Sequence, residues 1–339
     1  MKAIRIEEPG KLELAEIEKP KIANPLEVLI KVTAGSICGS DVGIYKGTNS
    51  LATYPAIIGH EFGGFVEEVG GMVEGIKVGD LVAVDPVRSC GHCYACTHGR
   101  QNVCRDVVCV GVHKPGGFAE YVTAPADRAH KVDPKRIAPD MVCLVEPYGI
   151  GVQVNQRGRI AKEDMVLVMG AGPAGLCIMQ DAKARGAYVM MSDIVDERLA
   201  FAREMGADQT VNGAKDDIRK VVDELTGGEG MPVVVDAACT VKSFPQALDL
   251  ACAAGRVVIL GLGANASEVA AVAITKKELD VIGSRLNNRR FPEVIATMAR
   301  GQYAPDKLRS HSFPFTKAQE AFDLVLNHPE SVRKVVLTF

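Results

Sequence analysis

A glycine-rich turn between a buried strand and a helix constrains this chain more than any other feature. The apolar run 166–169 leads into Gly-Ala-Gly-Pro-Ala-Gly at 170–175, and a helical pattern continues to about Arg185. A second apolar strand pattern, at 188–192, ends at Asp193. Gly-x-Gly-x-x-Gly alone is a weak signal, but the strand before it, the helix after it and an acid about 20 residues on predict a dinucleotide-binding fold.

The residues of this turn predict how a dinucleotide is held. The first two glycines let the backbone approach a pyrophosphate, the third lets helix and strand pack closely, and the helix N-terminus favours negative charge. Asp193 is expected to accept hydrogen bonds from ribose hydroxyls and to repel a 2′-phosphate, which favours NAD over NADP. Arg198 could soften that preference, or could pair with Asp193 or Glu197. The candidate cofactor-binding residues are Gly170, Gly172, Pro173, Ala174, Gly175, Asp193 and Arg198.

The hydrophobic pattern predicts two different halves. Buried strand patterns recur at 233–236, 257–261 and 279–283, with a helical stretch at 243–252, so we expect a parallel sheet with helices on both faces. Residues 1 to about 85 contain short strand patterns joined by Gly and Pro turns, which indicates a mostly β half.

The tail after residue 285 is too small for a domain of its own. It has helical patterns at 292–300 and 316–327 and a last strand pattern at 334–337, and we expect it to return to the first half. The predicted fold class is therefore α/β. We expect a catalytic domain at 1–148 and 286–339, with a metal lobe at about 88–106, and a Rossmann NAD-binding domain at 149–285.

Composition excludes several classes of protein. With 339 residues, 47% of them hydrophobic and 24% charged, the chain has the profile of a globular protein large enough for two domains. The net charge of −3 and the absence of a basic run argue against a nucleic-acid partner. No apolar run approaches the roughly 18 residues of a membrane span, and the N-terminus does not resemble a signal peptide. We therefore expect a cytoplasmic protein.

Four of the ten cysteines form a tight cluster, Cys90, Cys93, Cys96 and Cys104. Two residues between successive thiols let neighbouring sulfurs converge on one ion, and in a cytosolic chain this pattern favours metal over disulfides. Four thiolates leave no open position, so the predicted zinc is structural. His92 and His98 are expected to be solvent-facing loop residues, because the thiols already fill the coordination shell.

A second donor set is spread along the chain: Cys38, His60, Glu61 and Glu146. One thiolate, one imidazole and two carboxylates suit a four-coordinate zinc with a position left free for water or substrate. This set predicts a catalytic zinc. The alternative, in which these residues serve the fold only, is disfavoured because a buried carboxylate and histidine are costly without partners.

These motifs resemble the zinc-containing medium-chain dehydrogenase/reductase family over essentially the whole chain. The match is carried by Cys38-Gly-Ser-Asp41, Gly59-His60-Glu61, the four-cysteine lobe and the glycine-rich turn. Glu146-Pro147 points to the branch of sorbitol, threonine and sugar-acid dehydrogenases, since the alcohol dehydrogenase branch typically has cysteine there. Runs such as Gly111-Val112-His113 and Gly283-Ser284-Arg285 look most like bacterial sugar-acid 5-dehydrogenases and a starvation-sensing oxidoreductase close to them.

The resemblance implies a GroES-like mostly-β catalytic domain beside the Rossmann domain, and a role for each matching residue. Cys38 and His60 would bind the catalytic zinc, with Glu61 and Glu146 as further ligands, one of them through water. Ser40 would hydrogen-bond the substrate oxygen and pass on its proton, and Asp41 could orient His60 or its loop.

One residue departs from the family pattern. Many relatives carry a histidine three residues after the Ser or Thr hydroxyl, whereas this chain has Gly43. The proton would then leave by another route, such as zinc-bound water and Glu61, or turnover would depend more steeply on pH.

The implied reaction is hydride transfer to NAD from a secondary alcohol of a sugar acid such as L-gulonate, L-galactonate or L-idonate. Arg285 could anchor the substrate carboxylate through two parallel hydrogen bonds or could have a structural role. The weaker substrate candidates are Tyr45, His113, Phe118 and Asn287. A polyol, L-threonine, or a catalytically weak NAD-binding regulatory role stay open as alternatives, and the family implies a homo-oligomer, either a dimer or a tetramer.

Overall fold

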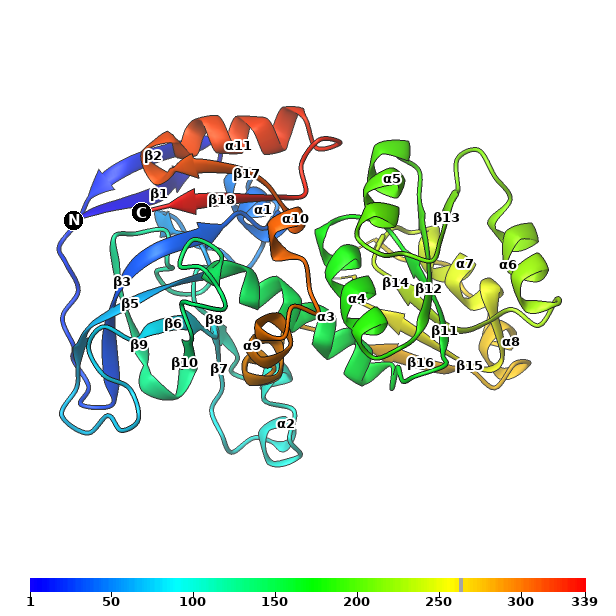
Figure 1. The fold of residues 1–339 in the computed structure, drawn as a ribbon, viewed down its shortest axis with the longest axis horizontal. Coiled ribbons are helices and arrows are strands. Elements are labelled where there is room, and N and C mark those ends of the chain that lie inside the picture. The colour runs from blue at the N-terminus through cyan, green and yellow to red at the C-terminus, as the bar shows by residue number, and fades with distance from the viewer. Residues whose placement is uncertain (262–264) are drawn as a thin grey trace. The chain divides into compact units, whose positions relative to one another are not determined.

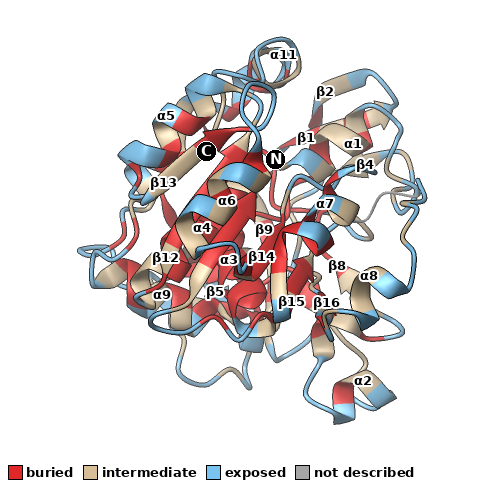
Figure 2. Ribbon diagram, turned by 90° about the vertical axis from the view of Figure 1, so that its right-hand side faces the viewer, coloured by how far each residue is buried: buried red, intermediate tan, exposed pale blue. Residues whose placement is uncertain are grey.

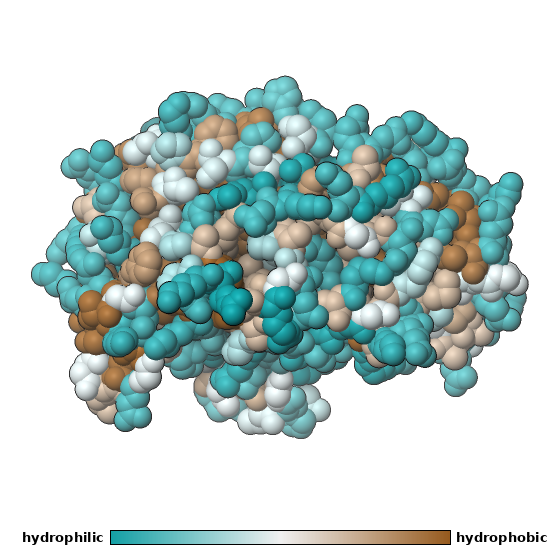
Figure 3. Space-filling model, viewed as in Figure 1, coloured by the Kyte–Doolittle hydropathy of each residue, from teal (hydrophilic) through white to brown (hydrophobic). Residues whose placement is uncertain are grey.

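The computed structural model describes residues 1–261 and 265–339, which form two compact units (Figure 1). Unit 1 comprises Met1–Gly149, Asn287–Gly301 and Pro305–Phe339, and unit 2 comprises Ile150–Leu286 and Gln302–Ala304. No helix of the described chain is long and apolar enough to cross a membrane. The face drawn in Figure 3 is mainly hydrophilic, with apolar side chains in scattered patches.

Unit 2 is built on a six-stranded parallel sheet in the order β13-β12-β11-β14-β15-β16. This is the doubly wound order of a Rossmann fold, so the predicted parallel sheet is confirmed. Its strands are β11 (Met165–Met169), β12 (Tyr188–Asp193), β13 (Gln209–Asn212), β14 (Met231–Asp236), β15 (Ala251–Ile259) and β16 (Asp280–Gly283). Its helices are α4 (Pro173–Ala184), α5 (Asp196–Glu204), α6 (Ile218–Thr226), α7 (Ser243–Leu250) and α8 (Val272–Thr275).

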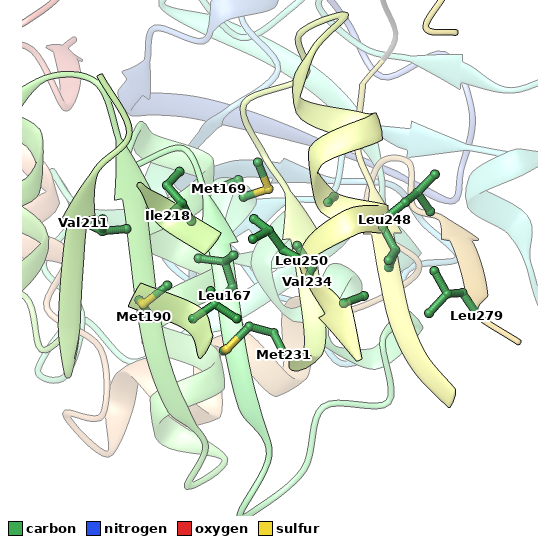
Figure 4. Packing of buried hydrophobic residues seen from close by; sticks show 14 residues of the cluster. Leu167, Met169, Met190, Val211, Ile218, Met231, Val234, Leu248, Leu250 and Leu279 are labelled. Atoms are coloured by element: carbon green, nitrogen blue, oxygen red, sulfur yellow. The ribbon is translucent and has the colours of Figure 1, made fainter. Parts of the chain in front are cut away.

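The central strands of this sheet are buried on both faces, as continuous apolar runs require. Leu167, Met190 and Val234 are fully buried, and side chains from α6 and α7 pack against them in one cluster (Figure 4). Helix α6 turns a polar face outward over the buried strands (Figure 2). Each buried Leu, Val or Met contributes about 1.5–3 kcal/mol, so this cluster holds the sheet that carries the glycine-rich turn.

Two local features of unit 2 differ from the sequence pattern. The predicted helix 243–252 ends at Leu250, because Ala251 is extended and pairs with Met231, so Cys252 lies in β15. The return of Gln302–Ala304 to unit 2 was not predicted. The Tyr303 hydroxyl donates to Asp181 at 2.6 Å, a tertiary contact that leaves no periodic signal in the sequence.

Unit 1 is mostly β, as its strand-and-turn pattern predicts. A seven-stranded sheet has the order β10-β6-β5-β3-β18-β17 with β9 paired to β3, and smaller sheets have the orders β2-β1-β4 and β7-β8. Its strands are β1 (Lys2–Glu8), β2 (Lys11–Glu16), β3 (Glu27–Ser36), β4 (Ala56–Ile57), β5 (Phe62–Val69), β6 (Leu81–Val84), β7 (Val87–Arg88), β8 (Val108–Cys109), β9 (Tyr121–Pro125), β10 (Ala129–Val132), β17 (Arg309–Pro314) and β18 (Lys334–Thr338).

Short helices fill the connections of unit 1. They are α1 (Gly39–Tyr45), α2 (Tyr94–Thr97), α9 (Phe291–Ala299), α10 (Pro305–Leu308) and α11 (Ala318–Asn327), while α3 (Val145–Arg157) begins at the end of the first segment. The last strand, β18, lies between β3 and β17 (Figure 1) and pairs Val336 with Ser36. This pairing brings the C-terminal strand beside the end of β3, where the first metal-donor motif begins.

Candidate active site

Three of the four predicted catalytic donors lie together in unit 1. One ligand atom each from Cys38, His60 and Glu61 falls within 4.8 Å of the others. Cys38 follows the end of β3 and His60-Glu61 precedes β5, and the antiparallel pairing of these strands, with Gly35 opposite Phe62, brings the two motifs side by side. His60 and Glu61 are buried, whereas Cys38 is half-buried, so the cluster has one accessible side.

Gly59 determines how His60 enters this cluster. Its φ of +94° lies in the left-handed region that favours glycine, and a Cβ there would sit 2.1 Å from a ring carbon of Phe118. Gly117 donates its N–H to the Gly59 carbonyl at 2.8 Å. The turn is therefore packed from one side by a fully buried phenyl ring, and Phe118 lies in the core of unit 1.

Asp41 holds the two donor segments together. Its carboxylate accepts the Cys38 N–H at 2.9 Å and the Gly59 N–H at 3.2 Å, and lies 3.6 Å from His60 Nδ1. The side chain is fully buried. Burial lowers the pKa of His60, but Asp41 and Cys38 raise it well above its ordinary value. The imidazole is thus oriented through Nδ1, which leaves Nε2 for the donor cluster.

Ser40 lies on the Nε2 side of the imidazole. Its hydroxyl oxygen is 3.4 Å from His60 Nε2, in the first turn of α1. Gly43 follows in the same helix, and a Cβ built there would contact Thr48 and Asn49 at an ordinary 3.6 Å. A Cβ atom therefore fits at position 43 without a clash.

The two carboxylates of the predicted set have different surroundings. Glu61 accepts from the Ser36 hydroxyl and pairs with Lys334, whose Nζ lies 2.6 Å from Oε2 and also contacts Oε1. Glu146, in the first turn of α3, is buried and lies outside the 4.8 Å group. Burial raises the pKa of Glu146 to about 8, against the lowering effect of His60. Ser36 and Lys334 were not predicted from the sequence. The only signal was that Lys334 is a charged residue at the first position of an apolar strand.

The donor chemistry of this cluster fits zinc. A thiolate, an imidazole and a carboxylate are the ligands zinc takes in catalytic sites, where three protein groups leave one position open. Cys38 is held at the N-terminus of α1, where the Asp41 N–H points at its sulfur.

The four-cysteine lobe forms a second donor cluster. All four sulfurs lie within 4.8 Å of one another, with separations of 3.4 Å for Cys90 and Cys104, 3.5 Å for Cys93 and Cys96 and 3.8 Å for Cys93 and Cys104. Zn–S bonds of about 2.3 Å place tetrahedral sulfurs about 3.8 Å apart, so the cage fits a closed zinc site. Backbone N–H groups of Arg105 and Cys96 lower the pKa of Cys93 to about 6.

The two histidines of the lobe lie outside this cage. His92 Nδ1 is 3.0 Å from the Cys90 carbonyl and His98 Nδ1 is 2.7 Å from the Tyr94 carbonyl, and both side chains are exposed. Among the described residues, neither histidine belongs to a metal-donor group.

The glycine-rich turn has the geometry that a pyrophosphate needs. Gly170 has φ +103°, and a Cβ on Gly175 would lie 1.9 Å from the Gly170 carbonyl oxygen, so helix and strand pack there without a side chain. A Cβ on Gly172 would meet nothing within 4 Å, which leaves open space before the helix N-terminus. Pro173 and Ala174 form the first turn of α4.

Asp193 ends β12 beside this turn. Its carboxylate accepts the Ala171 N–H at 2.8 Å and the N–H groups of Ile194 and Val195 at 2.8 and 3.0 Å, while Arg198 Nη1 lies 4.0 Å away. The acid is thus fixed at the carboxyl edge of the sheet, where dinucleotides bind.

The substrate candidates are dispersed. Arg285 follows β16 in unit 2 and is partly buried. In unit 1, the ring of Tyr45 lies tilted against that of Phe322, with the ring centroids 5.5 Å apart. His113 Nδ1 accepts the Cys109 N–H at 3.0 Å, and Asn287 is buried and donates to Asp85 at 3.2 Å. The contacts of Tyr45 and Asn287, like the burial of Phe118, stabilise unit 1.

Known proteins resemble the chain over its whole length. Residues 24–134 match the alcohol dehydrogenase GroES-like domain and residues 173–300 match the zinc-binding dehydrogenase family. The starvation-sensing protein RspB of Escherichia coli K12 is 42% identical, with 100% of this chain and 99% of RspB covered. The chain belongs to the zinc-type medium-chain dehydrogenase/reductase family. This dehydrogenase is therefore an oxidoreductase that uses zinc and NAD, with a GroES-like and a Rossmann-like domain.

Other members of the family show its range. The L-threonine 3-dehydrogenase of Pyrococcus abyssi is 40% identical, covering 92% of this dehydrogenase and 91% of that protein. A crystal structure described as the short chain alcohol dehydrogenase RspB from E. coli CFT073, complexed with cofactor NADH, superimposes with a TM-score of 0.94 at 42% identity, covering 100% and 99%. The L-idonate 5-dehydrogenase of E. coli K-12 has a TM-score of 0.90 at 25% identity, covering 100% and 98%.

Proposed function

We propose that this dehydrogenase oxidises a secondary alcohol of a sugar acid, a hexonate such as L-gulonate, L-galactonate or L-idonate at C5, and passes the hydride to NAD. The observation that carries the proposal is the grouping of Cys38, His60 and Glu61 with the Ser40 hydroxyl. Residues 1–148 and 286–339 would carry the chemistry and residues 149–285 the cofactor, in a cytoplasmic homo-oligomer.

In this proposal Cys38, His60 and a carboxylate hold the catalytic zinc, and Cys90, Cys93, Cys96 and Cys104 hold the structural one. Zinc at the first site supplies a Lewis acid that lowers the pKa of a substrate hydroxyl. Ser40, whose oxygen lies on the Nε2 side of His60, would relay the hydroxyl proton by accepting it and passing on its own. Asp41 keeps that imidazole in place from the opposite side. With glycine at position 43, the proton is released through Glu61 and not through a histidine relay.

The carboxylate preference rests on where Arg285 stands in unit 2. The glycine-rich turn follows β11, Asp193 ends β12 and Arg285 follows β16, so all three lie at the carboxyl edge of one parallel sheet. Ligands of such sheets bind outside that edge. An arginine there can hold a carboxylate through two parallel hydrogen bonds.

L-Threonine is the second candidate substrate, because threonine dehydrogenases match nearly the full chain at about the identity of RspB. It also carries a carboxylate, so Arg285 does not separate the two. NADH formation should be measured with zinc-replete protein, NAD and a panel of hexonates, hexitols and L-threonine. Turnover of hexonates alone supports the proposal, and turnover of threonine or hexitols alone replaces the substrate. Silence across the panel, with NAD still bound, would favour a regulatory protein.

Arg285→Met tests the anchor. It should raise KM for the anionic substrate by about 10–100-fold, the cost of a charged hydrogen bond, and leave KM for a neutral alcohol nearly unchanged. Arg159→Met, which removes an exposed arginine paired with Asp280 in the same unit, is the matched control. Equal losses on anionic and neutral substrates would reject the anchor.

A further inference from the structure

A buried lysine reaches the catalytic donors from the last strand of the chain. Lys334 is 3% exposed, the one buried lysine among the residues that the structure describes. Its Nζ contacts both carboxylate oxygens of Glu61, with 2.6 Å to Oε2, and donates to the Ile37 carbonyl at 3.2 Å. Since a buried ammonium is costly without a partner, Lys334 and Glu61 stabilise each other.

Lys334 also balances the charge of the donor set. Cys38 and Glu61 are the two anionic groups of this cluster when ionised. The Lys334 ammonium offsets part of that charge from inside the protein. Zinc and Lys334 therefore act on the same Glu61 carboxylate from two sides, because its oxygens lie within 4.8 Å of the Cys38 and His60 donors and also contact Nζ.

We propose that Lys334 is a positioning residue that competes with zinc for the Glu61 carboxylate. Without zinc, it holds Glu61 in place together with the Ser36 hydroxyl, which donates to the same carboxylate. With zinc, Lys334 draws electron density from Glu61 and so weakens Glu61 as a ligand. The coordination position that Glu61 occupies then stays exchangeable. The inference rests on the proposed assignment of zinc to Cys38 and His60.

When Lys334 is replaced, competition predicts a rise in zinc affinity, whereas a merely structural role predicts a fall. In Lys334→Met the Glu61 carboxylate has no cation except zinc, so zinc affinity at this site should rise about tenfold or more. The zinc-free protein should be less stable, because Glu61 is then buried without a counter-ion, and zinc should restore most of that loss. If Lys334 only supported the fold, its removal would loosen Glu61 and lower zinc affinity.

The measurement is competition for zinc between the full-length, metal-stripped protein and a chelating dye. Cobalt substitution provides a second readout, since the absorption bands of bound Co²⁺ should shift in Lys334→Met if Glu61 coordinates more strongly. Lys131→Met removes an exposed lysine paired with Asp80 at 2.9 Å in the same unit and should leave zinc affinity unchanged. Unchanged or weaker zinc binding in Lys334→Met would overturn the inference.

Two further variants keep the test decisive. Should Lys334→Met not fold, Glu61→Gln can be compared with the double variant Glu61→Gln/Lys334→Met, which contains neither buried charge. The double variant should bind zinc within about twofold of Glu61→Gln, because neither variant has the carboxylate for which Lys334 and zinc compete; a rise of about tenfold would assign the effect to general repulsion by the ammonium and reject the competition. Cys38→Ser separates the two proposals: if it binds as much zinc as the wild type, the zinc assignment itself fails.

Discussion

The two metal-donor clusters of unit 1 are built in opposite ways. The four cysteines of the lobe lie between residues 90 and 104, and the other contacts to their sulfurs come mainly from nearby backbone N–H groups. The other cluster, for which we propose the catalytic role, draws Cys38, His60 and Glu61 from two motifs and fixes them with Asp41, Ser36 and Lys334. A closed local cage suits a metal that supports the fold, while a mixed, half-accessible cluster with its own hydrogen-bonded support suits one that meets a substrate.

Cys38→Ser gives the largest expected contrast. Loss of the thiolate should remove one zinc per chain and lower kcat/KM by roughly 10³-fold or more, since the metal supplies several kcal/mol of transition-state stabilisation. The melting temperature should change little, because the Asp41 contacts to backbone N–H groups persist. Zinc content and NADH formation measure the two effects. Full activity with one zinc lost would mean that the catalytic roles of the clusters are reversed.

Cys93→Ser should produce the opposite pattern. It should also remove one zinc per chain, but the loss should appear as local unfolding of the lobe, with roughly 3 kcal/mol or more of local stability lost, because metal binding and folding are coupled there. Trypsin should then cut after the exposed Arg100 or Arg105. We expect kcat to stay within about tenfold of wild type, since a four-thiolate cage has no open position. A loss of turnover without faster proteolysis would contradict a purely structural lobe.

The same substitution, glycine to alanine, can be made beside each metal-donor cluster, at Gly59 and at Gly91. Both have positive φ, +94° and +82°, but a Cβ at Gly59 would collide with Phe118 whereas one at Gly91 would meet nothing within 4 Å. Gly59→Ala should therefore cost about 3 kcal/mol of unfolding free energy and displace His60, and Gly91→Ala only about 1 kcal/mol. Chemical denaturation and zinc content report both. Equal costs would show that the packing around the catalytic turn adds no stability.

Asp41→Asn tests the hydrogen-bonded support that Asp41 gives to Cys38 and His60, which the four-cysteine lobe lacks. The amide can keep one acceptor oxygen but presents an NH₂ group to backbone N–H groups or to His60. Outer groups of this kind typically contribute 10–100-fold to metal affinity or activity, and we expect a loss of that order at the catalytic site. The lobe zinc should be unaffected, which chelator competition on the same sample can verify. If both zincs weaken together, Asp41 supports the whole unit and not the cluster.

The contrast between the clusters also explains what the sequence could predict. The lobe and the glycine-rich turn are local, so spacing alone indicated their chemistry and the parallel sheet around the turn. Cys38, His60 and Glu61 could be selected by residue type, but their grouping depends on the pairing of β3 with β5. Lys334 follows no motif, and its approach to Glu61 results only from the insertion of β18 beside β3. Sequence-distant partners of this kind are set by tertiary topology, and a single sequence carries little trace of them.

The exposed ion pair of Asp80 and Lys131 should give the smallest change in stability, and it is the reference for the buried pair of Glu61 and Lys334. Asp80 accepts from Lys131 Nζ at 2.9 Å and from the Lys77 N–H at 3.0 Å, and Lys131 is half exposed. Burial raises the pKa of Asp80, but these two hydrogen bonds hold it below its ordinary value.

A carboxyl group whose folded pKa is depressed stabilises the fold above its unfolded pKa, and that stability is lost as pH falls through the folded value. Asp80→Asn should therefore cost about 0.5–1 kcal/mol at neutral pH, and this difference should begin to shrink near pH 4 and vanish only below the depressed folded pKa. Urea denaturation of both proteins across that range checks the sign. A pH-independent difference would assign the effect to lost backbone hydrogen bonding, and Lys131→Met would then no longer calibrate the charge of Lys334.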